Sequence, residues 1–261
     1  MRFKLILNIN RQAFGNLLPI NYMYPMSAVV YHILGQADKQ YATWLHNNGF
    51  TSSEGKKFKL FTFSRFKIEK RKIFPQSERI AILCDTIEWQ ISFLPEKSTE
   101  QFIQGLFANQ TFEIADKKSK VQFHVRNIEV LPSPIFSEEM EFSSMSPICM
   151  RCKQEDGKIK YISPSDPKAK EAILTSLLSR YEAYNKKSFT GTNDFDFVTL
   201  NEPKSVLENI KADTKEETKV RGYMCQFKMK ASIELMHIMY ESGIGEECSQ
   251  GFGCVRINKT K

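Results

Sequence analysis

The feature that most constrains the fold is a Pro- and Ser-rich segment near the middle of the chain, Leu131 to Pro147. It holds three prolines and five serines among seventeen residues, a composition that favours turns over regular structure. A chain of 261 residues is long enough for two domains of average size. We therefore predict two domains, residues 1–135 and 136–261. The alternation near Glu139 indicates that a strand already begins inside the segment.

Hydrophobic periodicity predicts a similar order of elements in the two halves. The first half is expected to contain strands and helices at Phe3–Ile9, Met23–His46 (helical), Lys59–Phe74, Ile80–Cys84, Ile87–Leu94 and Glu96–Ala108 (helical), then strands to Val130. The second is expected to contain them at Ser146–Met150, Lys158–Ile162, Asp166–Tyr184 (helical), Phe195–Leu200, Lys219–Lys230, Ser232–Tyr240 (helical) and Cys254–Ile257. The repeated alternation predicts an α+β fold of two tandem ferredoxin-like (RRM-like) domains with antiparallel sheets. The polar segment Leu200–Gly222 is expected to be a connection without chemistry.

Positive charge is concentrated in one stretch, KKFKLFTFSRFKIEKRK, Lys56 to Lys72. It carries eight cationic residues and one acidic residue, within a chain of net charge +7. Its phenylalanines alternate with cations and Thr62 closely enough to predict a strand that buries the aromatic rings and presents the cations on its other face. Such a row of cations indicates a polyanionic partner and favours a nucleic-acid backbone.

A glycine-rich stretch, GIGEECSQGFG, lies at Gly243 to Gly253. It matches neither the spacing of a dinucleotide fingerprint nor that of a P-loop, and it follows a predicted helix instead of preceding one. Glycines let another backbone approach closely, so this loop could lie against RNA or against the neighbouring domain. Glu246 and Glu247 would repel phosphate, so we expect them to face solvent or pair with a cation.

Cysteine, histidine and carboxylate spacing gives no metal site and no cofactor motif. Cys149 and Cys152 form a single CxxC pair without a second half, and the cysteines are expected to remain thiols. His124 and His237 lie in apolar or alternating surroundings and are expected to be structural. His46 ends a predicted helix that stops at Asn48–Gly49. A histidine there could simply interact favourably with the helix dipole. Alternatively, it could assist metal-independent cleavage of RNA, in which the 2′-hydroxyl of the RNA attacks the adjacent phosphate.

Three separated stretches together resemble the CRISPR-associated endoribonuclease that processes precursor CRISPR RNA, the repeat-cutting member of the repeat-associated RNA-binding superfamily. The glycine stretch is similar to the C-terminal signature of this family, G-h-G-x(4)-S-x-G-[FY]-G. MRFKLILNIN with PINYMYPMSAVVYHIL is similar to its first strand and helix. TWLHNNGF followed by KLFTFS is similar to its histidine at a helix end and the strand that follows. The resemblance spans the chain.

The resemblance implies two ferredoxin-like domains and metal-independent cleavage of repeat RNA, leaving a 2′,3′-cyclic phosphate and a 5′-hydroxyl. It implies that His46 is the catalytic general acid, that Tyr31 helps activate the 2′-hydroxyl, and that Lys59 stabilises charge on the phosphate. The neighbour of Tyr31, His32, points about 100° away on a helix, so one of the two is expected to face the site. Lys56 and Lys57 remain alternatives to Lys59.

The expected RNA contacts are Lys56, Lys57, Arg65, Lys67, Gly243, Gly245, Ser249, Gly251, Phe252 and Gly253. The expected partner is CRISPR repeat RNA, with other Cas subunits of an interference complex and a second copy of the chain as further candidates. A non-cleaving RNA-binding subunit of a CRISPR ribonucleoprotein is the alternative function, and an RNA-binding protein unrelated to CRISPR is a third. No apolar run reaches the roughly 20 residues of a membrane span, and the N-terminus alternates like a strand, which predicts a cytoplasmic protein with no membrane partner.

Overall fold

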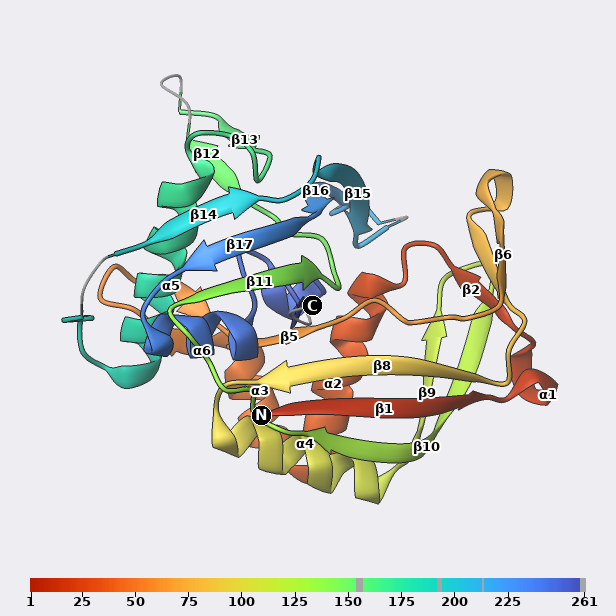
Figure 1. The fold of residues 1–261 in the computed structure, drawn as a ribbon. Helices are drawn as coiled ribbons and strands as arrows, with labels where there is room; N and C mark the ends of the chain where they lie inside the picture. Colours follow the sequence, from red (N-terminus) through yellow and green to blue (C-terminus); the bar gives the residue numbers. More distant parts are fainter. Residues whose placement is uncertain (154–156, 192–193, 213, 259–261) are drawn as a thin grey trace.

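The computed structural model describes residues 1–153, 157–191, 194–212 and 214–258. Its first sheet runs in the order β5-β8-β1-β10-β9, and every pairing is antiparallel (Figure 1). The strands are β1 (Arg2–Ile9), β5 (Phe61–Phe63), β8 (Thr86–Phe93), β9 (Thr111–Ala115) and β10 (Lys120–Leu131). In the sequence, helical segments separate β1 from β5 and β8 from β10. These four strands therefore follow the ferredoxin-like β-α-β-β-α-β pattern.

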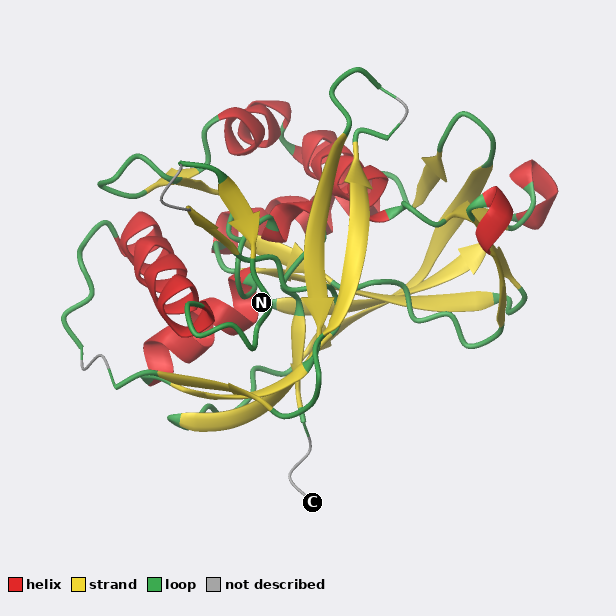
Figure 2. Ribbon diagram, turned by 90° about the horizontal axis from the view of Figure 1, so that it is seen from above, coloured by secondary structure: helices red, strands yellow, loops and turns green. Residues whose placement is uncertain are grey.

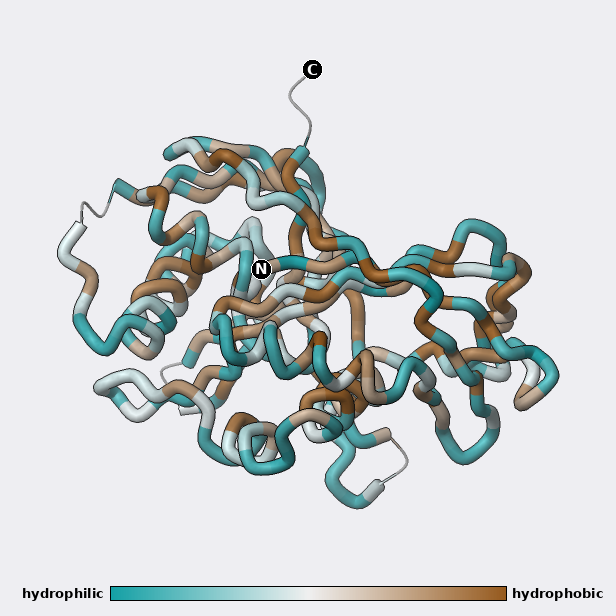
Figure 3. Tube along the Cα trace, turned by 90° about the horizontal axis from the view of Figure 1, so that it is seen from below, coloured by the Kyte–Doolittle hydropathy of each residue, from teal (hydrophilic) through white to brown (hydrophobic). Residues whose placement is uncertain are grey.

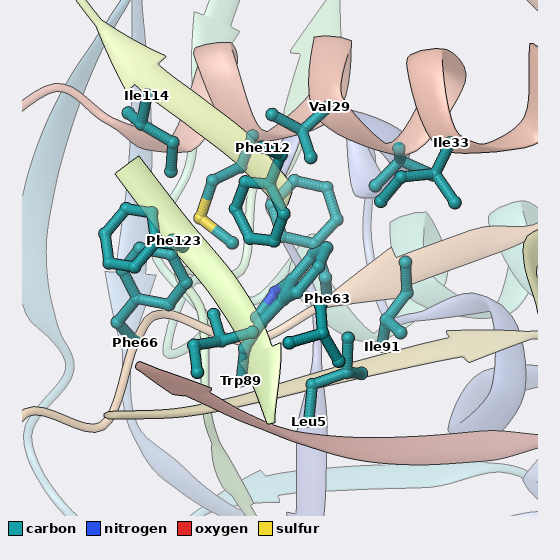
Figure 4. Packing of buried hydrophobic residues seen from close by; sticks show 14 of the residues in the cluster. Leu5, Val29, Ile33, Phe63, Phe66, Trp89, Ile91, Phe112, Ile114 and Phe123 are labelled. Atoms are coloured by element: carbon teal, nitrogen blue, oxygen red, sulfur yellow. The ribbon is translucent and has the colours of Figure 1, made fainter. Parts of the chain in front are cut away.

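Helices α2 (Met23–Ala37), α3 (Lys39–Asn47) and α4 (Glu96–Ala108) belong to this first half. Helix α2 buries residues that are spaced three and four positions apart. These residues, together with those of α4, pack against aromatic side chains of the sheet. Trp89 lies at the centre of this core (Figure 4). The helical region expected at Met23–His46 is divided at Asp38, whose carboxylate accepts a hydrogen bond from Tyr41 N and caps α3.

The second sheet repeats the topology of the first, with the order β14-β17-β11-β18 and antiparallel pairing throughout. Its strands are β11 (Glu139–Ser144), β14 (Asp196–Thr199), β17 (Gln226–Lys230) and β18 (Val255–Ile257). Helices α5 (Ala169–Asn185) and α6 (Ile233–Ser242) supply the helical layer. The predicted α+β fold of tandem ferredoxin-like units is therefore confirmed.

Short elements decorate these two units, and hydrophilic stretches are prominent in the loops at the periphery (Figure 3). These additional elements, in which η marks a 3-10 helix, are α1 (Arg11–Phe14), β2 (Leu17–Pro19), β3 (Phe50–Thr51), β4 (Lys57–Phe58), β6 (Arg71–Phe74), η1 (Pro75–Ser77), β7 (Arg79–Ile82), β12 (Arg151–Lys153), β13 (Ile159–Tyr161), β15 (Lys204–Ile210), β16 (Thr218–Met224) and η2 (Cys248–Gln250). Among the described residues, no helix has the length and apolar character needed to cross a membrane.

Besides Ser146–Met150, which forms only isolated β-bridges at Ile148 and Cys149 instead of the expected strand, two predictions about strands need correction. The cationic stretch is not one strand with an aromatic and a cationic face, because β5 covers only Phe61–Phe63 and all three of its residues are buried. Helices cover one face of β5, while on the other Thr62 Oγ1 donates to Phe252 O of the second half over 2.9 Å. Leu200–Gly222, expected to be a connection, instead contains β15 and most of β16, which pair as a hairpin.

The two halves lie side by side (Figures 1 and 2) and are joined by buried polar contacts. Ser92 Oγ of β8 donates to a carboxylate oxygen of Glu241 on α6, and the Met1 amino group lies 2.8 Å from Glu241 Oε2. The Arg2 guanidinium lies 3.7 Å from the centroid of the Tyr240 ring. These contacts fix the relative placement of the surfaces that carry the predicted site residues.

Candidate active site

His46 lies in the last turn of α3, where the sequence predicts it. The helix stops because Gly49 adopts a φ of 66°, and the amides of Asn48 and Gly49 both donate to Trp44 O, over 2.8 and 3.0 Å. The imidazole is exposed, and its Nδ1 lies 3.0 Å from Asn47 Oδ1. This places an accessible proton donor or acceptor at the surface of the first half.

The ring of Tyr31 on α2 contacts the ring of His46 on α3. Their ring centroids are 4.9 Å apart, with an angle of 80° between the planes. Burial raises the pKa of the Tyr31 phenol, and a hydrogen bond with the Ser249 side chain opposes that rise. His32 is exposed and its Nε2 lies 3.2 Å from Gln36 Nε2, so Tyr31 is the member of this pair that lies beside His46.

Lys59, which follows β4, completes the cluster. Its Nζ donates to His46 O over 2.6 Å. Burial, followed by the charge of Lys57, lowers the pKa of Lys59 below its usual value. Lys57 Nζ donates to Asn47 O over 3.3 Å, while Lys56 Nζ lies 3.1 Å from Glu54 Oε2. The structure thus brings His46, Tyr31 and Lys59 together, and of the three lysines it places Lys59 against the histidine.

The glycine-rich loop lies inside the molecule, between the two halves. Five of the predicted RNA contacts there are buried: Gly243, Gly245, Gly251, Phe252 and Gly253. The amides of Gly251 and Gly253 donate to the carbonyl oxygens of Cys248 and Pro147. Burial argues against direct RNA contact at Gly243, Gly251, Phe252 and Gly253, because other parts of the chain pack around them, whereas Gly245, although buried, borders a cavity.

Ser249 differs from the glycines of the loop because it is half-buried and reaches the cluster of His46, Tyr31 and Lys59. Its carbonyl oxygen accepts from Ser27 Oγ of α2 over 2.7 Å, and its side chain hydrogen-bonds with Tyr31. The expectation that Glu246 and Glu247 pair with a cation is confirmed, since both form ion pairs with Arg151. The loop therefore joins the second half to the helix that carries Tyr31.

A cavity of about 660 Å³ opens beside this cluster, between β4 and the second half. Its basic lining residues are Lys56, Lys57, Lys59, Arg151, Lys168 and Arg180, and its acidic ones are Glu171, Glu246 and Glu247. Arg151 pairs with two of the three carboxylates, and the six cations of the lining outnumber the carboxylates, so the net charge of the lining is positive. A cleft with this excess of cations concentrates phosphate groups.

Arg65 and Lys67 lie outside this cavity lining and are engaged elsewhere. Arg65 forms an ion pair with Glu208 of β15, and Lys67 Nζ lies 2.9 Å from Glu88 Oε1. Burial raises the pKa of the Glu208 carboxyl, and the charge of Arg65 acts against that rise. The structure therefore separates these two cations from Lys56, Lys57 and Lys59, with which the sequence analysis grouped them.

Sequence reasoning missed Arg151, Lys168 and Arg180 as lining residues of the cavity. They come from β12, the residue before α5, and the interior of α5, all in the second half. No local pattern marks them, since each lies in a segment whose composition is unremarkable for a strand or helix. Only the packing of the second half against β4 brings them near Lys59.

No group of His, Cys, Asp and Glu side chains among the described residues has an arrangement that could hold a metal ion. None of the six cysteines, all of which lie in the described ranges, forms a disulfide, and burial raises the pKa of the Cys149 thiol. His124 lies 3.3 Å from Thr111 Oγ1 through its Nδ1, and His237 packs against Phe136.

Two family models match the chain. The model for CRISPR-associated protein Cas6, N-terminal, covers residues 17–129, and that for CRISPR associated protein Cas6, C-terminal, covers residues 131–257. The chain is 30% identical over 243 residues to the CRISPR-associated endoribonuclease Cas6 1 of Methanocaldococcus jannaschii. That alignment covers 91% of this chain and 86% of its relative.

Solved structures agree with the sequence comparisons. One described as "Characterization of a Cas6-related gene from Pyrococcus furiosus" superimposes with a TM-score of 0.83 at 26% identity, covering 100% of this chain and 99% of that one. Another, "CRISPR associated protein Cas6", gives 0.74 at 27% identity, covering 99% of each chain. Together with the glycine signature and the repeated ferredoxin-like topology, these matches show that the chain belongs to the Cas6 family of CRISPR-associated proteins.

Proposed function

We propose that this protein is a metal-independent endoribonuclease that cleaves CRISPR repeat RNA to mature the guide RNAs. The observation that carries the proposal is the cluster of His46, Tyr31 and Lys59 beside a cavity lined with cations. The cavity can hold a phosphate backbone, and the cluster offers a proton donor, a phenol and an ammonium group at its edge. The name of the M. jannaschii relative, an endoribonuclease, supports the same activity.

In the proposed reaction the 2′-oxygen attacks the adjacent phosphorus while the bond from phosphorus to the 5′-oxygen breaks. The 2′-hydroxyl proton passes to water, and protonated His46 gives a proton to the departing 5′-oxygen. Lys59 stabilises the negative charge that develops on the phosphate. Because burial raises the pKa of Tyr31, the phenol stays protonated and orients the reacting group by hydrogen bonding.

The products follow from this route. They are a 2′,3′-cyclic phosphate on the upstream fragment and a 5′-hydroxyl on the downstream one. We expect end-labelled repeat RNA to be cleaved at an unchanged rate in EDTA, and mass spectrometry of the fragments to find these ends. RNA carrying a 2′-deoxyribose just upstream of the scissile phosphate is the control, because it lacks the nucleophile.

Three outcomes would contradict the proposal. Cleavage of the deoxy control would exclude attack by the 2′-oxygen, and loss of cleavage in EDTA would exclude a metal-independent route. Tight binding of the repeat without any cleavage would instead favour the alternative function, a non-cleaving RNA-binding subunit. Light scattering of the same preparation, with and without RNA and other Cas proteins, would test association with a second copy or with those proteins.

The charge of Lys57 provides a test of the role assigned to Lys59. Lys57 lowers the pKa of Lys59, so Lys57→Gln should raise that pKa and keep Lys59 cationic to a higher pH. We therefore expect the alkaline limb of the single-turnover pH-rate profile to move to higher pH when Lys57→Gln is made in a His46→Ala background, which removes the contribution of the general acid to the profile. Lys67→Gln is the matched control, because Lys67 pairs with Glu88 instead. An unmoved limb in Lys57→Gln, or a shift to lower pH, would argue against Lys59 as the cation at the phosphate.

A further inference from the structure

Arg180 is a buried cation whose role is not explained by the proposed chemistry. It lies in the interior of α5 with only 3% of its surface exposed. Its Nη1 donates to the carbonyl oxygens of Ser242, over 3.3 Å, and Gly243. Its Nη2 donates to Gly245 O and lies 3.1 Å from Cys248 Sγ. The guanidinium therefore hydrogen-bonds with several atoms at the start of the glycine-rich loop.

No carboxylate among the described residues forms an ion pair with Arg180, which is unusual for a buried charge. Compensation comes from the end of α6, where the last carbonyl groups lack helical partners and carry the negative end of the helix dipole. The planar fork of a guanidinium can hold carbonyl groups on both of its terminal nitrogens, and two of the three carbonyls bound here, those of Gly243 and Gly245, flank buried Ile244. A lysine at this position would keep the charge but lose the fork.

Two paths lead from this guanidinium to the catalytic cluster. Along the loop, the segment bound by Arg180 continues to Ser249. The Ser249 side chain hydrogen-bonds with Tyr31, and its carbonyl oxygen accepts a hydrogen bond from Ser27. Through β4, the guanidinium lies 5.7 Å from the centroid of the Phe58 ring, and Phe58 directly precedes Lys59 in the chain. Arg180 thus contacts Phe58, the residue before Lys59, and Cys248, the residue before the Tyr31 partner Ser249.

We propose that Arg180 is a positioning residue, which holds the glycine-rich loop and β4 so that Tyr31 and Lys59 meet the scissile phosphate in the correct geometry. This inference rests on the proposed endoribonuclease function. Arg180 does not itself have to touch the RNA, since its donors are already occupied by backbone carbonyls. The glycine signature then serves to let the loop pack between α5 and α2, and Arg180 sets its position.

The test compares Arg180→Lys with wild type and with Arg221→Lys, which makes the same change at an exposed arginine of β16 bonded to Ser205. We expect single-turnover cleavage by Arg180→Lys at saturating enzyme to fall about 10- to 100-fold, the loss typical of a displacement of about 1 Å in an active site. Affinity for non-cleavable 2′-deoxy repeat RNA should stay within about 3-fold, because the lysines lining the cavity are unchanged. Arg221→Lys should match wild type in both measurements.

Ser249→Ala completes a double-mutant cycle and keeps the test decisive if Arg180→Lys does not fold. It removes the contact of the loop with the Tyr31 phenol while leaving Arg180 in place, and it should also slow cleavage with little change in affinity. If Arg180 acts through the loop, the two losses combined should be smaller than their product.

Four results would overturn the inference. They are wild-type cleavage by folded Arg180→Lys, losses that multiply in the double variant, wild-type cleavage by folded Ser249→Ala, and a change in affinity that equals the change in rate. Absence of cleavage by the wild-type protein would be a different result. It would overturn the proposed function itself, and this inference with it.

Discussion

His46→Ala is expected to lower the single-turnover cleavage rate by about 10²- to 10⁴-fold, the usual contribution of a general acid or base. The alanine variant cannot protonate the departing 5′-oxygen, which must then leave as an alkoxide or take a proton from water. The exposed imidazole packs only its edge against Tyr31, so its loss should leave the fold intact. Affinity for repeat RNA, measured with the non-cleavable 2′-deoxy strand, should change by no more than a few-fold because the cationic cavity lining remains.

His32→Ala is the matched control for this measurement. His32 is also an exposed histidine, lies next to Tyr31 in the chain, and interacts with Gln36 on its own helix. It should cleave at the wild-type rate. If His46→Ala lost affinity as much as rate, or if His32→Ala were the slower variant, His46 could not be the general acid.

Gly245→Ala is expected to destabilise the protein by about 2–5 kcal/mol, the sum expected from left-handed strain and overpacking. Gly245 has a φ of 80°, and a Cβ at this position would lie 2.3 Å from Cys149 O. The clash is with a backbone atom that cannot rotate away, and Gly245 O is also held by Arg180. Chemical denaturation followed by fluorescence of the buried Trp89 would measure the change in the free energy of unfolding.

Gly55→Ala separates the strain from the clash. Gly55 has a φ of 79°, almost the same as that of Gly245, but a Cβ there would meet nothing within 4 Å. This variant should lose only about 1–2 kcal/mol, the cost of the left-handed conformation alone. Equal losses in the two variants would show that the loop tolerates a methyl group against Cys149. The close packing inferred for the glycine signature would then be wrong.

The sequence predicted the course of the chain well wherever the information is local. The end of α3 near Gly49 follows from residues within one helical turn, and α4 has the predicted bounds, Glu96–Ala108. The two strand errors have a different cause. The strand around Phe61 is buried on both faces because the second half covers it, and the β15–β16 hairpin is ordered by contacts with the first half such as the ion pair of Glu208 with Arg65. The hydrophobic periodicity of a segment does not show which distant part of the chain will pack over it.

The candidate site shows the same division. The resemblance identified His46, Tyr31 and Lys59 from three separate stretches, and the structure brings them together. It also identified the glycine loop, but not that its glycines are buried or that Ser249 reaches Tyr31. Arg151 and Arg180 carried no signal at all. Their importance comes from partners about 60 to 100 residues away in the chain.

By itself the sequence determined the positions of the main helices, the α+β class, the family signature and the excess of positive charge. These are properties of short segments and of composition, which local periodicity and motif spacing encode directly. Only the tertiary structure decided which cations remain available at the cavity and which are held in ion pairs, and it buried Gly243 and Gly251–Gly253 between the halves while leaving Gly245–Gln250 in the cavity lining. The physical reason is that burial and charge pairing depend on which distant surfaces pack together, and in this protein two similar domains pack through GIGEECSQGFG.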